Sequence, residues 1–82
     1  MIPKEGNDLL ELHLEQGRKA ESDVLAERML TGAEAILGYA LACNHLTPVE
    51  YGGRIASVKL IRAQRDNRNI ELAAQQAGLT KN

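Results

Sequence analysis

Residues 31–50 read TGAEAILGYALACNHLTPVE and hold a long apolar segment between two helix-start signals. The first signal, residues 31–34 (TGAE), is a capping box, in which the threonine oxygen accepts a hydrogen bond from the glutamate amide while the glutamate side chain reaches back. From Ala35 to Leu46 the residues are apolar around most of a helical wheel. A helix that is apolar on most sides is buried. We therefore expect a buried central helix over residues 32–46.

The second signal, residues 47–50 (TPVE), is another capping box, improved by proline at the first helical position. The helix that it starts contains two glycines, at positions 52 and 53, and is then predicted by good helix formers to continue to about Arg65. Residues 66–69 (DNRN) are typical of a turn. We therefore expect a short last helix over residues 70–77 that ends at Gly78.

The N-terminal side of the central segment leaves one boundary open. Asn7 is a suitable cap for a first helix with an apolar leucine stripe. Gly17 allows two interpretations. In one, the helix ends there and Ser22 caps a second helix; in the other, the first helix continues to about residue 30. We favour the continuous helix.

Composition predicts an all-α protein. Good helix formers dominate, prolines occur only at positions 3 and 48, and apolar alternation is weak. The 82 residues make one domain, which we expect to be a small bundle of three to four helices. A chain this short has a small core, and its single cysteine forms no intramolecular disulfide. Because self-association is the remaining way to bury apolar area, we expect a helical homodimer.

Cellular location is predicted mainly from absent signals. The N-terminus carries a charged residue of each sign and lacks the apolar core of a signal peptide. The longest uncharged apolar run, Ala35 to Cys43, has nine residues, less than half of what a membrane span needs. A lone cysteine fits a reducing compartment. We therefore expect a cytoplasmic protein without a membrane partner.

Charge divides the chain into two halves. Residues 1–50 carry nine carboxylates and four cations, a net charge of −5, whereas residues 51–82 carry six cations and two carboxylates, a net charge of +4. The overall charge of −1 hides this division. Such a division is informative about partners rather than about chemistry.

The helix that starts at residue 48 has two apolar faces. One face contains larger side chains with arginines in the same arc, and the other contains the smaller group Val49, Ala56, Leu60 and Ala63. In one interpretation the smaller face packs on the central helix while the arginine heads reach water. In the other, the arginine-ringed aliphatic face is a recognition surface.

Catalytic, metal-binding and cofactor-binding patterns are missing from the sequence. Cys43 and His45 are two residues apart and point to different sides of a helix, so they form no nucleophile–base pair. We expect Cys43 to be a small core residue and His13 to lie at a solvated helix edge. No zinc spacing and no phosphate-binding loop occurs. The sequence therefore predicts a protein that is not an enzyme and that needs no cofactor.

The leading hypothesis is a regulatory or adaptor protein that binds another protein. Its predicted contact surface lies on the basic helix and consists of Arg54, Ile55, Val58, Lys59, Arg62 and Arg65. One alternative is a nucleic-acid-binding regulator that places the same arginines on phosphates, although the chain is acidic overall and poor in aromatic residues. A second alternative is an oligomerisation module whose charge division matches one subunit to another.

Overall fold

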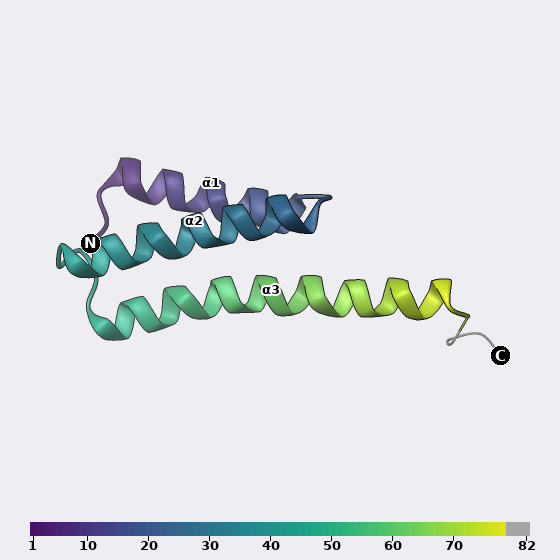
Figure 1. Cartoon of the computed structure of the whole chain (residues 1–82). Coiled ribbons are helices and arrows are strands. Elements are labelled where there is room, and N and C mark those ends of the chain that lie inside the picture. Colours follow the sequence, from purple (N-terminus) through teal and green to yellow (C-terminus); the bar gives the residue numbers. More distant parts are fainter. Residues whose placement is uncertain (79–82) are drawn as a thin grey trace.

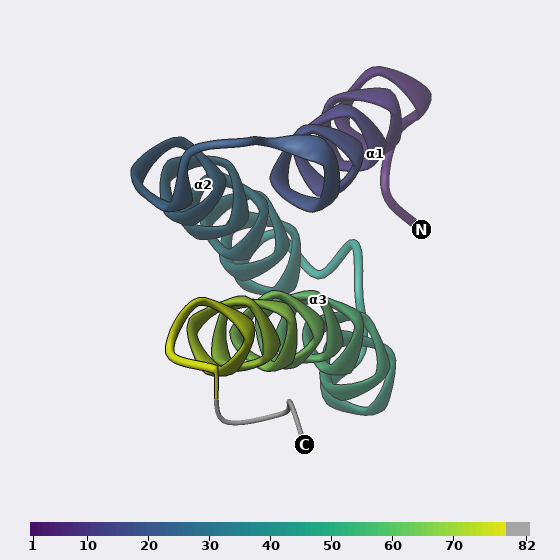
Figure 2. The same cartoon turned by 90° about the vertical axis from the view of Figure 1, so that its right-hand side faces the viewer.

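The computed structural model describes residues 1–78, which form three helices. They are α1 (Lys4–Lys19), α2 (Asp23–Ala42) and α3 (Pro48–Gln76), and the described residues contain no strand. Each helix runs antiparallel to the one before it (Figure 1). Viewed along the helices, α1 and α3 lie on two different sides of α2 (Figure 2). The predicted all-α bundle is confirmed. None of these helices has the length and apolar character required to span a bilayer.

The core lies along α2, as its apolar sequence predicts. Leu30 and Leu37 of α2, Leu10 of α1 and Val58 of α3 are fully buried. The predicted central helix over residues 32–46 is wrong at both ends, because α2 begins at Asp23 and ends at Ala42. Ser22 caps it by accepting a hydrogen bond from the amide of Leu25 at 3.3 Å. Residues 31–34 therefore lie in the middle of a longer helix.

The end of α1 also differs from the favoured prediction. The helix ends at Lys19, and the backbone is extended at Ala20, where ψ is 133°. The continuous helix to residue 30 is therefore wrong, and the alternative, with Ser22 starting a second helix, is correct. Asn7 is not the first cap, because its amide already donates to the carbonyl of Pro3 at 2.9 Å. The helix begins three residues earlier, at Lys4.

The start of α3 is as predicted, and its continuation is not. The amide of Glu50 donates to Thr47 Oγ1 at 3.1 Å, and the Thr47 amide donates to Glu50 Oε1 at 2.9 Å. No turn forms at residues 66–69, so α3 is one helix of 29 residues. Gly78 follows it with a φ of 76°, a conformation that favours glycine. The last turns of α3 extend past the end of the α1–α2 hairpin (Figure 1).

Candidate functional site

Arg62 is the centre of the contact between α3 and α2. Its Nη2 donates to Glu27 Oε1 at 2.7 Å and to Glu34 Oε1 at 2.8 Å, and its Nε donates to Glu27 Oε2 at 3.2 Å. The two glutamates are seven residues apart, two helical turns on one side of α2. Hydrogen bonds from Arg62 lower the pKa of Glu34, and the two carboxylates raise the pKa of Arg62. The guanidinium therefore links α3 to both glutamates of α2.

Arg65 occupies a second position of this kind, at the α1–α2 turn. Its Nη1 donates to the carbonyl oxygens of Ala20 at 2.7 Å and Gly17 at 3.3 Å, and its Nη2 donates to Asp23 Oδ1 at 2.8 Å. The side chain is only 12% exposed. A cation at the carbonyl end of a helix stabilises that end. Arg65 thus binds the last turn of α1, and its hydrogen bond also lowers the pKa of Asp23.

Of the other residues of the predicted contact surface, some are buried in the core and some are exposed to solvent. Val58 is fully buried and Ile55 is half-buried against the core. Arg54 is exposed and its Nη1 donates to Asn7 Oδ1 at 3.4 Å, a long hydrogen bond, while Lys59 is exposed. As folded, the predicted set is therefore mainly an interface within the chain. Val58 has no surface with which to contact a partner.

The side of α3 that packs on α2 is the one with the larger residues. Val58 and Ile61 are buried, whereas Val49 and Leu60 are 85% and 59% exposed. The interpretation in which the smaller face packs on the central helix is therefore wrong. The reason is charge as well as size, because only the larger face brings Arg62 against carboxylates of α2.

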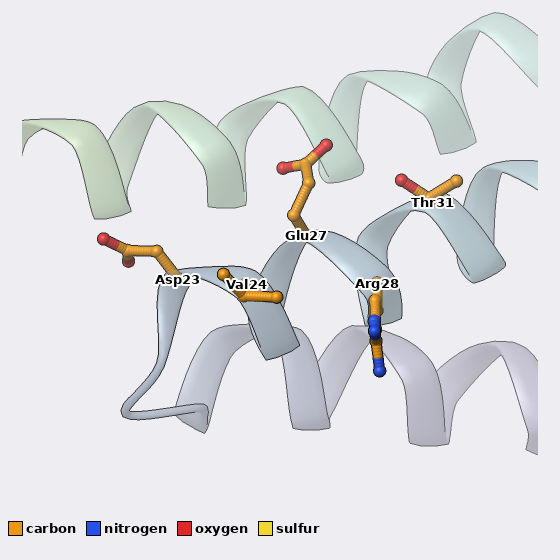
Figure 3. Close-up of a pocket in the computed structure, with 5 residues that line it drawn as sticks. All are labelled: Asp23, Val24, Glu27, Arg28 and Thr31. Atoms are coloured by element: carbon orange, nitrogen blue, oxygen red, sulfur yellow. The ribbon is translucent and has the colours of Figure 1, made fainter.

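A second exposed surface, which the sequence analysis missed, lies on α2. A shallow depression of about 680 Å³ is lined by Asp23, Val24, Glu27, Arg28 and Thr31. Figure 3 shows that Glu27 points toward α3 and Arg28 toward the α1 side, with Val24 on the helix surface between them. No strong sequence signal marks this surface, because four of its five lining residues are polar or charged.

The residues whose side chains could take part in catalysis or bind a metal are dispersed over the structure. His13 Nδ1 lies 2.8 Å from the carbonyl oxygen of Leu9, and its ring lies against Gly32. Cys43 is exposed rather than part of the core, because α2 ends one residue before it. A hydrogen bond with Cys43 raises the pKa of Tyr39. Within residues 1–78 no cluster of histidine, cysteine and carboxylate side chains could hold a metal ion.

Comparison with known proteins gives no relative. No family model, no curated protein and no solved structure matches this chain.

Proposed function

We propose that this protein is a non-catalytic regulatory or adaptor protein that binds another protein through the outer face of α2. The observation that carries the proposal is that one side of α2 stays exposed along the helix, because α1 and α3 cover only its other sides (Figure 2). The α2 outer face consists of Val24, Arg28, Thr31, Ala35, Tyr39 and Ala42, all of them exposed.

The side chains of the α2 outer face suit a protein partner. At 100° per residue they fall within an arc of roughly 80°. Val24 and Tyr39 are 68% and 70% exposed, so an aliphatic and an aromatic anchor lie near opposite ends of the face. Aromatic residues with an exposed polar atom are frequent in binding hot spots. Small residues such as Ala35 between the anchors would let a partner helix approach closely. An amphipathic helix is the partner that fits this shape.

The proposal moves the contact surface from α3 to α2 because of how the arginines are used. Arg62 and Arg65, the two arginines central to the predicted surface, are paired with carboxylates of the same chain. Bringing them to a partner would break these pairs. The same pairing disfavours the nucleic-acid alternative, since a phosphate would have to displace Glu27, Glu34 or Asp23 from them.

Photo-crosslinking at Tyr39 in living cells that carry the gene tests the proposal. Tyr39→p-benzoylphenylalanine keeps an aromatic ring at an exposed position, and the same substitution at Gln75 of α3 serves as the control. We expect an adduct heavier than two 9.0 kDa chains from position 39 and none from position 75. Absence of any such adduct from position 39, or equal yields from the two positions, would contradict the proposal.

A second variant tests whether the α2 outer face itself makes the contact. Ala35→Glu places a charge in the middle of the face, at an exposed position where it disturbs no packing within the chain. We expect it to remove the adduct while the helical circular dichroism spectrum stays unchanged. Ala35→Ser, which is nearly the same size as alanine, should keep the adduct.

A further inference from the structure

The solvent side of α3 carries a continuous seven-residue repeat. Its positions alternate in steps of four and three along the helix, which is the spacing that brings two helices together along one seam. We call this set the α3 seam: Val49, Gly53, Ala56, Leu60, Ala63, Asn67, Ile70 and Ala74. All are exposed except Ala74, which is half-buried. Within residues 1–78, no other helix covers the seam.

On the opposite side of α3, residues with the same spacing of four and three already pack against the rest of the chain. These residues face the core and the α1–α2 hairpin: Tyr51, Ile55, Val58, Arg62, Arg65 and Asn69. The helix therefore has two seams. One is packed against the hairpin, and the other is open.

We propose that the open seam binds the α3 seam of a second copy of this chain, antiparallel, with the two-fold axis between residues 61 and 62. In this register every large seam residue lies opposite a small one. Leu60 faces Ala63 of the second copy, Ile70 faces Gly53, Val49 faces Ala74 and Asn67 faces Ala56. Alternation of large and small side chains across facing positions lets the layers interdigitate.

A parallel pair would lack this complementarity. It would place each residue opposite its own copy, so two leucines would meet at position 60 and two glycines at position 53. The first layer would be crowded and the second would leave a void. The antiparallel axis also lies close to the middle of α3 (Pro48–Gln76), so the two helices overlap over residues 49–74, roughly 39 Å.

Charge along one flank of the seam supports the same register. Lys59 lies opposite Asp66 of the second copy, and the symmetry makes this pair twice. Within residues 1–78 neither side chain forms an ion pair in its own chain. On the other flank Glu50 comes opposite Glu71 at the two ends of the overlap. The Glu50 carboxylate is turned back to its capping box, where it accepts from the amide of Thr47.

This dimer does not use the α2 outer face, because the α3 seam and the α2 outer face belong to different helices and share no residue. The inference therefore goes beyond the proposed function and does not depend on it. If the protein is monomeric in solution, the dimer proposal fails, and the proposed function is still tested separately by the crosslink at Tyr39.

Sedimentation equilibrium of the full chain, at about 1–100 µM, tests the dimer. We expect a mass near twice 9.0 kDa that falls toward 9.0 kDa on dilution. Ala63→Glu buries a charge in the seam of each copy and should weaken association about tenfold or more. Gln75→Glu makes the same charge change off the seam and should leave association unchanged. A wild-type chain that stays at 9.0 kDa, or an Ala63→Glu chain as dimeric as wild type, would overturn the proposal.

A charge-swap pair tests the orientation. Lys59→Glu puts like charges opposite each other twice and should weaken the dimer about tenfold. Adding Asp66→Lys to the same chain reverses both members of each pair and should restore association to near the wild-type value. In a parallel dimer Lys59 would face Gln64 and Asp66 would face Glu71. Lys59→Glu alone would then leave association nearly unchanged, and that result would also contradict the antiparallel arrangement. Failure of the rescue would overturn the antiparallel arrangement. Both positions are exposed, and a circular dichroism spectrum confirms that each variant is folded.

Discussion

The guanidinium of Arg62 makes three hydrogen bonds to two carboxylates that the sequence places two turns apart. Its side chain is 27% exposed, and those of Glu34 and Glu27 are 37% and 59% exposed, so water screens part of the attraction. Bidentate arginine–carboxylate geometry still makes such a pair stronger than an ordinary surface ion pair. Arg62 is therefore the side chain through which a single substitution most directly weakens the contact between α2 and α3.

Substitution of Arg62 tests this role. Arg62→Ala should lower the free energy of unfolding by about 1–2 kcal/mol, because it removes charged hydrogen bonds and leaves Glu34 half-buried beside an apolar core. Thermal denaturation should show a fall of roughly 5–10 °C. The control is Arg68→Ala, which removes an exposed arginine six residues further along α3 and should change stability by less than about 0.5 kcal/mol. Equal melting temperatures for the two variants would contradict a structural role for Arg62.

The lowered pKa of Glu34 makes the same contact sensitive to acid. Its ordinary value is 4.5, and hydrogen bonding to Arg62 lowers it in the folded state. A carboxylate whose pKa falls on folding contributes its full stabilisation above the ordinary value and loses it as the pH falls through the lowered one. The difference in melting temperature between wild type and Arg62→Ala should therefore be constant from pH 7 to 5 and shrink below about pH 4.5. A difference that persists unchanged at pH 3 would show that Arg62 acts by packing rather than by charge.

At the scale of the element, the α1–α2 hairpin packs closely at Gly17. Gly17 is buried, and a Cβ atom added there would lie 2.8 Å from Cδ2 and 2.9 Å from Cγ of Leu30. Leu30 is itself fully buried and has little room to move. The close approach of α1 to α2 at this point therefore requires a residue without a side chain.

Two glycine substitutions that should change the free energy of unfolding in opposite directions test this requirement. Gly17→Ala should destabilise the protein by about 1–2 kcal/mol, since overpacking outweighs the gain in helix propensity. Gly52→Ala should stabilise it by about 0.5–1 kcal/mol, because that glycine is helical and has open space around it. Urea denaturation of the two variants measures both values. If Gly17→Ala stabilised the protein, Leu30 would have room to move away from the added Cβ atom, and the requirement for glycine would be wrong.

Prediction from sequence succeeded for elements whose signals are local. The capping box at residues 47–50 forms as predicted because its partners are three residues apart. The similar signal at residues 31–34 failed because residues 23–30 are helix formers and Ser22 supplies an earlier start. A capping box permits a helix to begin but does not require it to.

The boundaries that sequence reasoning missed are set by contacts distant in the chain. The end of α1 has carbonyls bound by Arg65, 45 residues beyond Ala20. The predicted turn at residues 66–69 is instead helical, and Asn69 donates to Asp23 Oδ2 at 3.0 Å. The choice between the two faces of α3 was likewise undecided by local pattern, since both are apolar at helical spacing. It is decided by the glutamates of α2, whose seven-residue separation places both within reach of Arg62.

At the scale of the whole molecule, the charge division of the sequence is partly used within the chain. The acidic residues Asp23, Glu27 and Glu34 belong to the hairpin, and the arginines that they bind belong to α3. Folding therefore brings the two oppositely charged halves together along the α2–α3 contact (Figure 2). The field that an outside partner meets is weaker than the sequence halves suggest, because paired charges at short distance cancel beyond a Debye length of about 8–10 Å.

Duplex DNA provides the test of that cancellation. Two of the six cations in residues 51–82, Arg62 and Arg65, are paired with carboxylates on the side of α3 that faces α2, so they cannot follow a phosphate backbone without opening the bundle. We therefore expect no change in the fluorescence anisotropy of a labelled random-sequence duplex titrated with the protein at about 50 mM salt, with an oligoarginine peptide as positive control. If the arginines were instead free to bind four to five phosphates, affinity would be measurable at 50 mM and would fall by roughly two to three orders of magnitude at 200 mM. Such a salt dependence would favour a nucleic-acid partner, because each phosphate that a protein cation neutralises releases counterions from DNA.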